Sequence, residues 1–153
     1  FIPDNVIQKM TRRRDWFRDD EYNLSSVAAD AVNIMRAGGR VGVGSHGQFQ
    51  GLGFHWELWA LQSGGMTEME ALRAATIGGA EIIGIASDVG SIEFGKLADF
   101  IILNEDPLDD IRNTNEIKYV VKNGRLYDGE TMDQIWPKKE KLKEFWWWDD
   151  VPQ

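Results

Sequence analysis

The feature that most constrains this chain is a helix that leads through two glycines into a short buried strand. Apolar residues from Val27 to Met35 recur on one helical stripe, and Gly38-Gly39 follow as a helix stop. The next residues, Arg40–Ser45, have the pattern of a strand whose alternating glycines imply a tightly packed neighbour. A helix followed by a buried strand is one step of a parallel α/β architecture.

The length of the chain limits how much of that architecture it can hold. It has 153 residues, whereas a complete eight-stranded β/α barrel typically needs about 250. The first residue is Phe1 and not Met, so we expect the natural N-terminus to be missing. The sequence therefore predicts one modest core and not a full barrel.

Composition excludes several classes of function. The net charge of −8 argues against nucleic acid as a general partner. No apolar run approaches the roughly 18 residues of a membrane span. The chain has no cysteine, which excludes disulfides, thiolate nucleophiles and Cys-ligated metals without fixing the compartment. Only two histidines, His46 and His55, are available to any site.

Two further helices are predicted after the glycine-rich loop. The first runs from about His55 to Ser63. Thr67 and Glu70 have capping-box spacing and open the second helix, which ends near Gly84. Small residues at Thr76 and Gly79 on one face of that helix would admit a close neighbour.

After Gly90 the periodicity becomes strand-like. The sequence predicts strands at Phe100–Leu103 and Ile117–Val121. Asn123-Gly124 is a strong hairpin signal directly after the second of these strands. The last part of the chain is a basic amphipathic tail that ends in Trp146–Trp148.

Two glycine-rich runs approach nucleotide-binding motifs. Gly42–Gly47 matches G-x-G-x-x-G, but Gly51 and Gly53 disfavour the helix that a dinucleotide site needs there. Gly90–Lys96 is one residue short of a phosphate loop, and Leu97 stands where a hydroxyl must bind magnesium. A dinucleotide site is therefore disfavoured, and the second run is interpreted as a turn between two short strands.

The two histidines flank the loop that follows the predicted strand. Residues at the carboxyl ends of strands are where chemistry gathers in parallel β/α folds. His46 and His55 could each be a metal ligand or proton carrier, or simply hydrogen-bond the nearby backbone. Glu57 is interpreted as a helix-surface or network residue, since His-Trp-Glu-Leu is not the zinc motif His-Glu-x-x-His.

Six segments together carry a family resemblance: Val41–Gly47, Gly51–Leu58, Met66–Thr76, Gly90–Leu103, Asp106–Ile111 and Val121–Arg125. Their order resembles the C-terminal part of the metal-dependent amidohydrolase superfamily, and most of all its imidazolonepropionase-like and TolB-associated members. The resemblance covers roughly residues 25–135, and the run from Gly90 to Asp99 is its most specific part.

The resemblance implies an α/β fold that is a C-terminal fragment of a (β/α)8 amidohydrolase barrel. Residues 1–24 would be an N-terminal loop segment, and 25–87 the end of the barrel, with its last helix, its eighth strand and the helices that follow. Residues 88–135 would be the C-terminal strands of a small β-sandwich subdomain, and 136–153 a Trp-rich tail.

The resemblance also implies a function. The parent protein would hydrolyse C–N bonds of small amide-type substrates through water activated by a divalent metal, with zinc the first candidate. The family's His-x-His pair and earlier strands are absent, so the fragment alone is expected to be inactive. His46 stands where the family has its eighth-strand Asp, which makes it the leading catalytic candidate and a weaker metal ligand; His55 is a weaker catalytic candidate.

A second interpretation also stays open. Instead of part of an enzyme, the chain could be a noncatalytic folding or assembly module derived from an amidohydrolase. In either case the unpaired strand edges and Trp146–Trp148 predict a homo-oligomer, or association with the missing N-terminal part.

Overall fold

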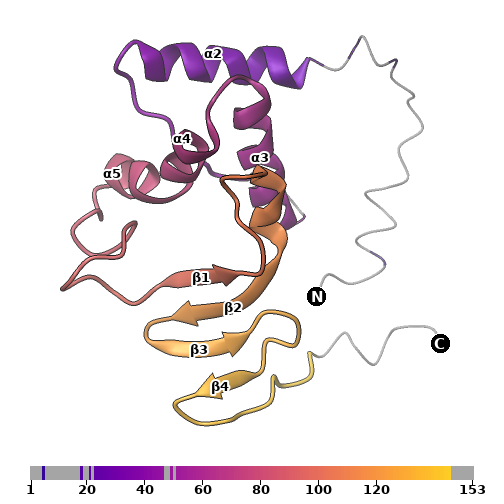
Figure 1. The fold of residues 1–153 in the computed structure, drawn as a ribbon, viewed down its shortest axis with the longest axis vertical. Helices are drawn as coiled ribbons and strands as arrows, with labels where there is room; N and C mark the ends of the chain where they lie inside the picture. The colour runs from indigo at the N-terminus through magenta and orange to yellow at the C-terminus, as the bar shows by residue number, and fades with distance from the viewer. Residues whose placement is uncertain are drawn as a thin grey trace.

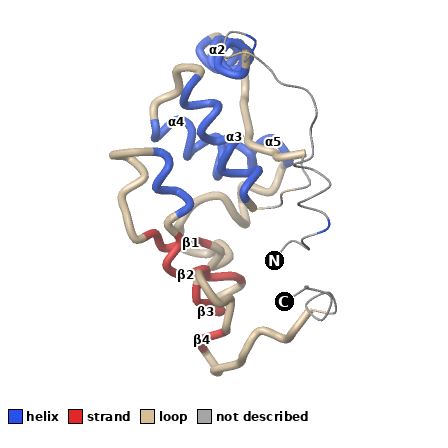
Figure 2. Tube along the Cα trace, turned by 90° about the vertical axis from the view of Figure 1, so that its right-hand side faces the viewer, coloured by secondary structure: helices blue, strands red, loops and turns tan. Residues whose placement is uncertain are grey.

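The computed structural model describes Asn5, Arg18, Glu21, Phe49 and residues 23–46 and 51–145. A group of helices between residues 24 and 83 lies over a small antiparallel sheet between residues 100 and 136 (Figure 1). The view turned by 90° shows the same two parts, with the strands gathered below the helices (Figure 2). The α/β class expected from the sequence is confirmed. The expected N-terminal loop segment falls largely outside the described residues.

Helix α2 spans Leu24–Arg36 and confirms the predicted helical stripe. It buries Ala28 and Val32, one turn apart, on the side that packs against α3 (Leu52–Ser63). Gly64 makes this close approach possible, because a Cβ there would lie only 2.5–2.7 Å from atoms of α2. The helix ends as predicted, with Gly38 at a φ of +88°.

The strand expected at Arg40–Ser45 is not formed, and that prediction was wrong. No described strand lies beside this segment to complete a hydrogen-bond ladder, which every strand requires. The alternation of a strand nevertheless persists: Val41, Val43 and Ser45 are half-buried, and the residues between them are exposed. The segment is held from the side, where the Val43 amide donates to the Ala74 carbonyl at 3.3 Å.

The predicted capping box is confirmed at the start of α4 (Glu68–Arg73). The Thr67 hydroxyl accepts from the Glu70 amide at 3.3 Å, and the Glu70 carboxylate accepts from the Thr67 amide at 2.9 Å. Arg36 of α2 forms a bidentate pair with the same carboxylate. Hydrogen bonds from Arg36 and then from Thr67 lower the pKa of Glu70 to about 2.

The helix that starts at Thr67 ends at Gly84, as expected, but it is not continuous. A π-helical turn, Ala74–Gly78, separates α4 from α5 (Gly79–Ile83). The carbonyl of Ala74, at the start of this turn, accepts the Val43 bond described above. The close neighbour expected at the small residues is Gly42, whose added Cβ would lie 3.3 Å from the Cα of Gly79.

The sheet has the order β1-β2-β3-β4 and is antiparallel throughout. Its strands are β1 (Phe100–Leu103), β2 (Ile117–Lys122), β3 (Arg125–Asp128) and β4 (Gln134–Trp136). The first two strands and the hairpin turn were predicted. Asn123 and Gly124 both have positive φ, of 50° and 74°, as a tight two-residue hairpin loop requires. Strand β4 was not predicted, because three residues are too few to show alternation.

The run Gly90–Asp99, which approaches a phosphate-loop motif, forms a turn region, and its last residue fixes the hairpin. Asp99 accepts from the Asn123 amide at 2.5 Å and pairs with Lys122. The hydrogen bond from Lys122, and then that from the Asn123 amide, lower the pKa of Asp99. Helix α5, and not the strand expected there, precedes the run.

The core lies among the helices, where Leu58 is only 1% exposed. Its other buried members are Val32, Met66, Ala71, Ala74 and Ile111. Ile111 comes from a 3-10 helix, Ile111–Asn115, that precedes β2 and packs against α3. This short helix therefore connects the sheet to the helical core.

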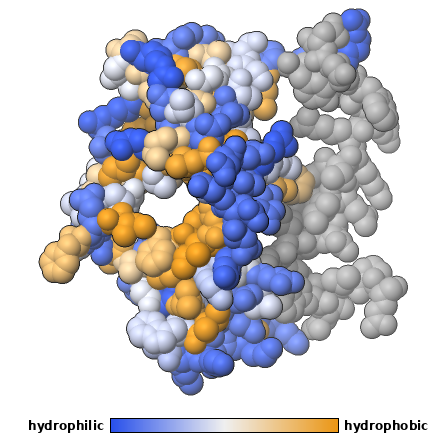
Figure 3. All heavy atoms as spheres, viewed as in Figure 1, coloured by the Kyte–Doolittle hydropathy of each residue, from blue (hydrophilic) through white to orange (hydrophobic). Residues whose placement is uncertain are grey.

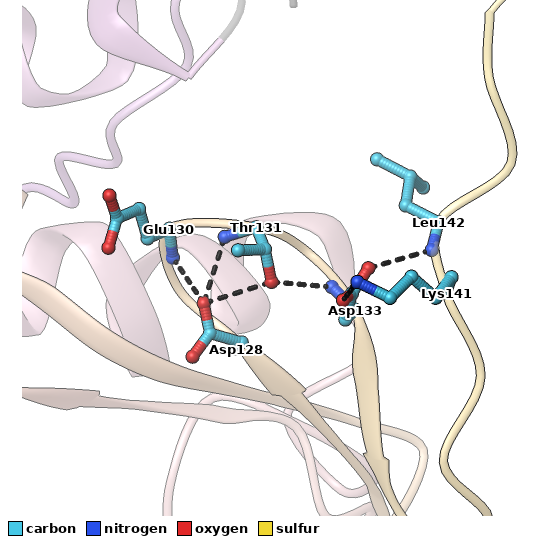
Figure 4. Close-up of polar contacts among 6 residues, drawn as sticks. All are labelled: Asp128, Glu130, Thr131, Asp133, Lys141 and Leu142. Atoms are coloured by element: carbon cyan, nitrogen blue, oxygen red, sulfur yellow. Dashed lines mark hydrogen bonds and ion pairs between the residues drawn. The ribbon is translucent and has the colours of Figure 1, made fainter.

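Asp128 holds the turn between β3 and β4, and Asp133 anchors the segment that follows the sheet (Figure 4). Asp128 accepts from the amides of Glu130 and Thr131 at 3.0 and 2.8 Å. The hydrogen bonds from Thr131 lower the pKa of Asp128. Asp133 accepts from the Leu142 amide at 2.9 Å.

Trp146–Trp148, whose packing was in question, lie outside the described residues. No described helix has the length and apolar character needed to cross a membrane.

Candidate functional site

A pocket of about 260 Å³ lies where the segment 41–45 meets α3, and His46 lines it. Its lining residues are Leu24, Ser45, His46, Phe49, Gly53, Trp56, Glu57 and Ala60. Segments far apart in the sequence therefore converge on one hollow, with the first residue of α2 at its rim. The imidazole of His46 is exposed here.

One face of helix α3 forms a wall of this pocket. Gly53, Trp56, Glu57 and Ala60 follow at i, i+3, i+4 and i+7, so they share one face of the helix. The segment 41–45 lies against that face, since a Cβ added at Gly53 would be in van der Waals contact with the Cβ of Ser45, at 3.5 Å. This spacing was visible in the sequence and is the signal that could have placed Glu57 at the site.

Glu57 and Trp56 are both fixed by their neighbours. The Gly44 amide donates to Oε2 of Glu57 at 3.3 Å. The Trp56 ring stands edge-on to Phe49, with centroids 5.8 Å apart and planes 60° apart. The pocket thus combines an imidazole, a carboxylate and an aromatic wall in one small hollow. Sequence reasoning singled out His46 and left Glu57 among surface or network residues.

His55 belongs to a different environment, although it is only nine residues from His46. It is 9% exposed, and its Nδ1 lies 3.1 Å from Oγ1 of Thr114 in the 3-10 helix. The Trp59 indole donates to the same hydroxyl at 3.1 Å. Burial lowers the pKa of His55. The structure does not bring the two histidines into one site, and His55 links α3 to the 3-10 helix.

The residues present do not fit a metal centre. No group of three or more His, Cys, Asp or Glu side chains that could hold a metal ion occurs in the described part of the chain. The complete sequence offers two histidines and no cysteine, and His55 is turned toward Thr114. Among the described residues, His46 is therefore not accompanied by the further ligands that a metal site needs.

A larger apolar groove of about 900 Å³ lies between the helices and the sheet. Its walls come from the π-turn and α5 on one side and from β1 and β2 on the other. The space-filling view shows an opening through the molecule that is rimmed largely by hydrophobic residues (Figure 3). Ile82, Ile83, Phe100 and Ile101 are among its exposed apolar residues. Sequence reasoning did not predict this groove, because its two walls are far apart in the chain.

Comparison with known proteins identifies the family. The model of the amidohydrolase family matches residues 8–127. An imidazolonepropionase of Geobacillus sp. (strain WCH70) is 34% identical over 119 residues, which cover 69% of this chain and 26% of that protein. An ochratoxinase of Aspergillus niger is 39% identical over 75 residues, which cover 46% of this chain and 16% of that protein.

A solved structure agrees with these sequence relatives. The crystal structure of a Xaa-Pro dipeptidase with bound methionine matches with a TM-score of 0.62 and 27% identity, over 82% of this chain and 32% of that one. The chain belongs to the amidohydrolase family, whose members are generally metal-dependent. It spans less than a third of the length of each of these relatives.

Proposed function

We propose that the protein to which this chain contributes hydrolyses C–N bonds of small amide-type or peptide-like substrates, with His46 at the reaction site. Membership of the amidohydrolase family supports the reaction class. The observation that carries the assignment of the site is the pocket that His46 and Glu57 line together, at the end of the segment 41–45.

In this proposal His46 moves a proton. A neutral imidazole can accept a proton at one ring nitrogen and return it later to the leaving nitrogen of the amide. Its exposure in the pocket leaves it accessible to a substrate. We assign no role in the reaction to His55, because it is buried against Thr114.

The resemblance to the superfamily implies that the whole enzyme binds a divalent metal ion, with zinc as the first candidate. The described residues do not fit such an ion, so we assign its ligands to parts of the enzyme other than these residues. The 153-residue chain alone is then inactive. The proposed organisation keeps residues 25–87 as the end of a barrel and 88–135 as strands of a small sandwich, an arrangement supported by the helical group and the sheet.

Two assays test the proposal. In the intact enzyme, His46→Ala is expected to lower turnover on a hydrolysed amide by roughly 100-fold or more, the usual range for a lost general base. Glu68→Gln, in α4 and away from the pocket, is the matched control. Equal activity of His46→Ala and the parent at equal metal content would contradict the role of His46.

The isolated chain supplies the second assay. Incubated with zinc or manganese, it is expected to leave hydantoin-like, dipeptide and lactone substrates intact. Metal-dependent turnover that survives repurification and is lost in His46→Ala would contradict the assignment of the metal ligands to other parts of the enzyme.

The apolar groove favours a second candidate function, a noncatalytic folding or assembly module. The two candidates differ in what lies upstream of the chain in the intact protein. A His-x-His pair there, with further strand-end histidines, favours the enzyme.

A further inference from the structure

We propose that the pocket beside His46 binds a protonated amine, which the Glu57 carboxylate and the Trp56 ring recognise. This inference rests on the proposed function and specifies its substrates: small amides that carry a free ammonium group on an apolar body. It assigns Glu57 as a specificity-determining residue.

The first argument is that the Glu57 carboxylate has unused hydrogen-bonding capacity. It is half-buried, and among the described residues it accepts a single hydrogen bond, from the Gly44 amide to Oε2. No lysine or arginine of the described part of the chain pairs with it, whereas half-buried Glu70 and Asp99 pair with Arg36 and Lys122. Oε1 of Glu57 is therefore available to a charged donor, and such a bond is stronger than one between neutral groups.

The second argument is the aromatic ring of Trp56, which lines the same pocket as this carboxylate. Trp56 is 47% exposed and is held edge-on by Phe49, so its ring can be covered by a ligand. An organic cation is attracted both by an aromatic face and by a carboxylate. The remaining lining includes Leu24, Gly53 and Ala60, which can only contact an apolar body.

The size of the pocket and the side chains that line it exclude a large ligand, a metal ion and an anion. A volume of about 260 Å³ limits the ligand to a small molecule. A metal ion would need more ligands than His46 and Glu57, and no group of three or more occurs in the described residues. An anion would meet the Glu57 charge, while no lysine or arginine is among the described residues that line the pocket.

The test compares two probes with the same body. L-phenylalaninamide carries a free ammonium group, whereas N-acetyl-L-phenylalaninamide does not. We expect isothermal titration with the 153-residue chain to give an affinity at least about tenfold higher for the free amine, a factor equal to about 1.4 kcal/mol. The Trp56 indole signal in NMR spectra is expected to shift with the same probe.

Variants then assign the effect to Glu57. Glu57→Gln keeps the shape and removes the charge, and is expected to abolish the preference for the free amine. Glu68→Gln, a half-buried glutamate outside the pocket, is expected to retain it. Trp56→Leu is expected to weaken binding of the amine more than that of its acetylated form. Circular dichroism confirms that each variant is folded.

The inference is overturned if neither probe binds, if both bind equally, or if Glu57→Gln keeps the preference of the parent chain. These are binding measurements, so they are independent of the proposed hydrolysis. Glu57-dependent binding of the amine to a protein that hydrolyses no amide would leave the pocket assigned and refute the proposed function. Hydrolysis of amides without preference for those that carry an amine would refute the pocket assignment and leave the proposed function standing.

Discussion

Gly90 is held in a position that no other residue fits. Its φ is +94°, and a Cβ there would lie 2.8 Å from the Cβ of Ala80 and 2.9 Å from the Cα of Ile77. Both contacts are with parts of the helix that cannot rotate away. The glycine is therefore needed for its backbone conformation and for the close approach of the turn to α5.

We expect Gly90→Ala to lower the free energy of unfolding by at least about 2 kcal/mol, since left-handed strain and overpacking each cost roughly 1–3 kcal/mol. Chemical denaturation measures the change. Gly95→Ala separates the two effects, because Gly95 has a similar φ of +91° but nothing within 4 Å of its added Cβ. Equal losses in the two variants would contradict the packing part of the argument.

His55 makes the stability of the chain depend on pH. Burial lowers its pKa below the ordinary 6.5. Between that lowered value and 6.5 the unfolded chain binds a proton that the folded chain does not, so the free energy of unfolding rises with pH in this interval. Full stability is therefore expected above pH 6.5 and a loss as pH falls through the interval.

Urea denaturation at a series of pH values checks this expectation. His55→Gln removes the titrating ring and is expected to flatten the dependence in this interval. His46→Gln is the matched control, because His46 is exposed and its replacement leaves the buried contact with Thr114 in place. A slope that survives in His55→Gln would assign the effect to other groups.

At the scale of the element, the interrupted helix from Glu68 to Ile83 depends on its first turn. Thr67 and Glu70 satisfy each other's amides there, and Arg36 ties that turn to α2. We expect Thr67→Ala to cost about 1 kcal/mol of unfolding free energy, the usual effect of losing an N-cap side chain.

A second threonine of the same helical stretch is the control for this variant. The hydroxyl of Thr76 donates to the Leu72 carbonyl, which the helix backbone can satisfy without it. Thr76→Ala is expected to change stability by less than about 0.5 kcal/mol in thermal or chemical denaturation. Equal effects of the two variants would show that the cap contributes little.

At the scale of the whole molecule, the helices and the sheet meet at one end and leave an apolar groove at the other. The contact is made by the 3-10 helix on α3, with Trp59 donating to the Ile111 carbonyl at 3.1 Å. The groove is bordered by β1, an edge strand whose Phe100, Ile101 and Ile102 are all exposed. Apolar edge strands of this kind invite pairing with another chain.

We therefore expect the isolated chain to self-associate at micromolar concentration, or to bind the remainder of its own protein when that is supplied. Light scattering measures the association. Ile101→Lys places a charge on β1 within the groove and is expected to reduce it. Leu108→Lys is the control, since Leu108 has the same exposure, 46% against 45%, but does not line the groove. A monomer at every concentration would contradict the expectation.

The sequence alone determined the elements whose signals are local. The stop of α2 at Gly38, the capping box at Thr67 and the hairpin at Asn123-Gly124 were all predicted from their own residues. Each depends on the conformation of one or two residues, or on a hydrogen bond across one turn. The strands β1 and Ile117–Val121 were found in the same way, because their apolar runs differ in period from the helices.

The tertiary structure alone decided what depends on distant partners. Arg40–Ser45 has the pattern of a strand, yet a strand exists only when another strand completes its hydrogen bonds. His55 and Glu57 are only two positions apart, but the helix turns the first toward Thr114 and the second into the pocket with His46. The spacing of residues in a helix shows which of them share a face, but the neighbour that this face meets is set by packing across the whole chain.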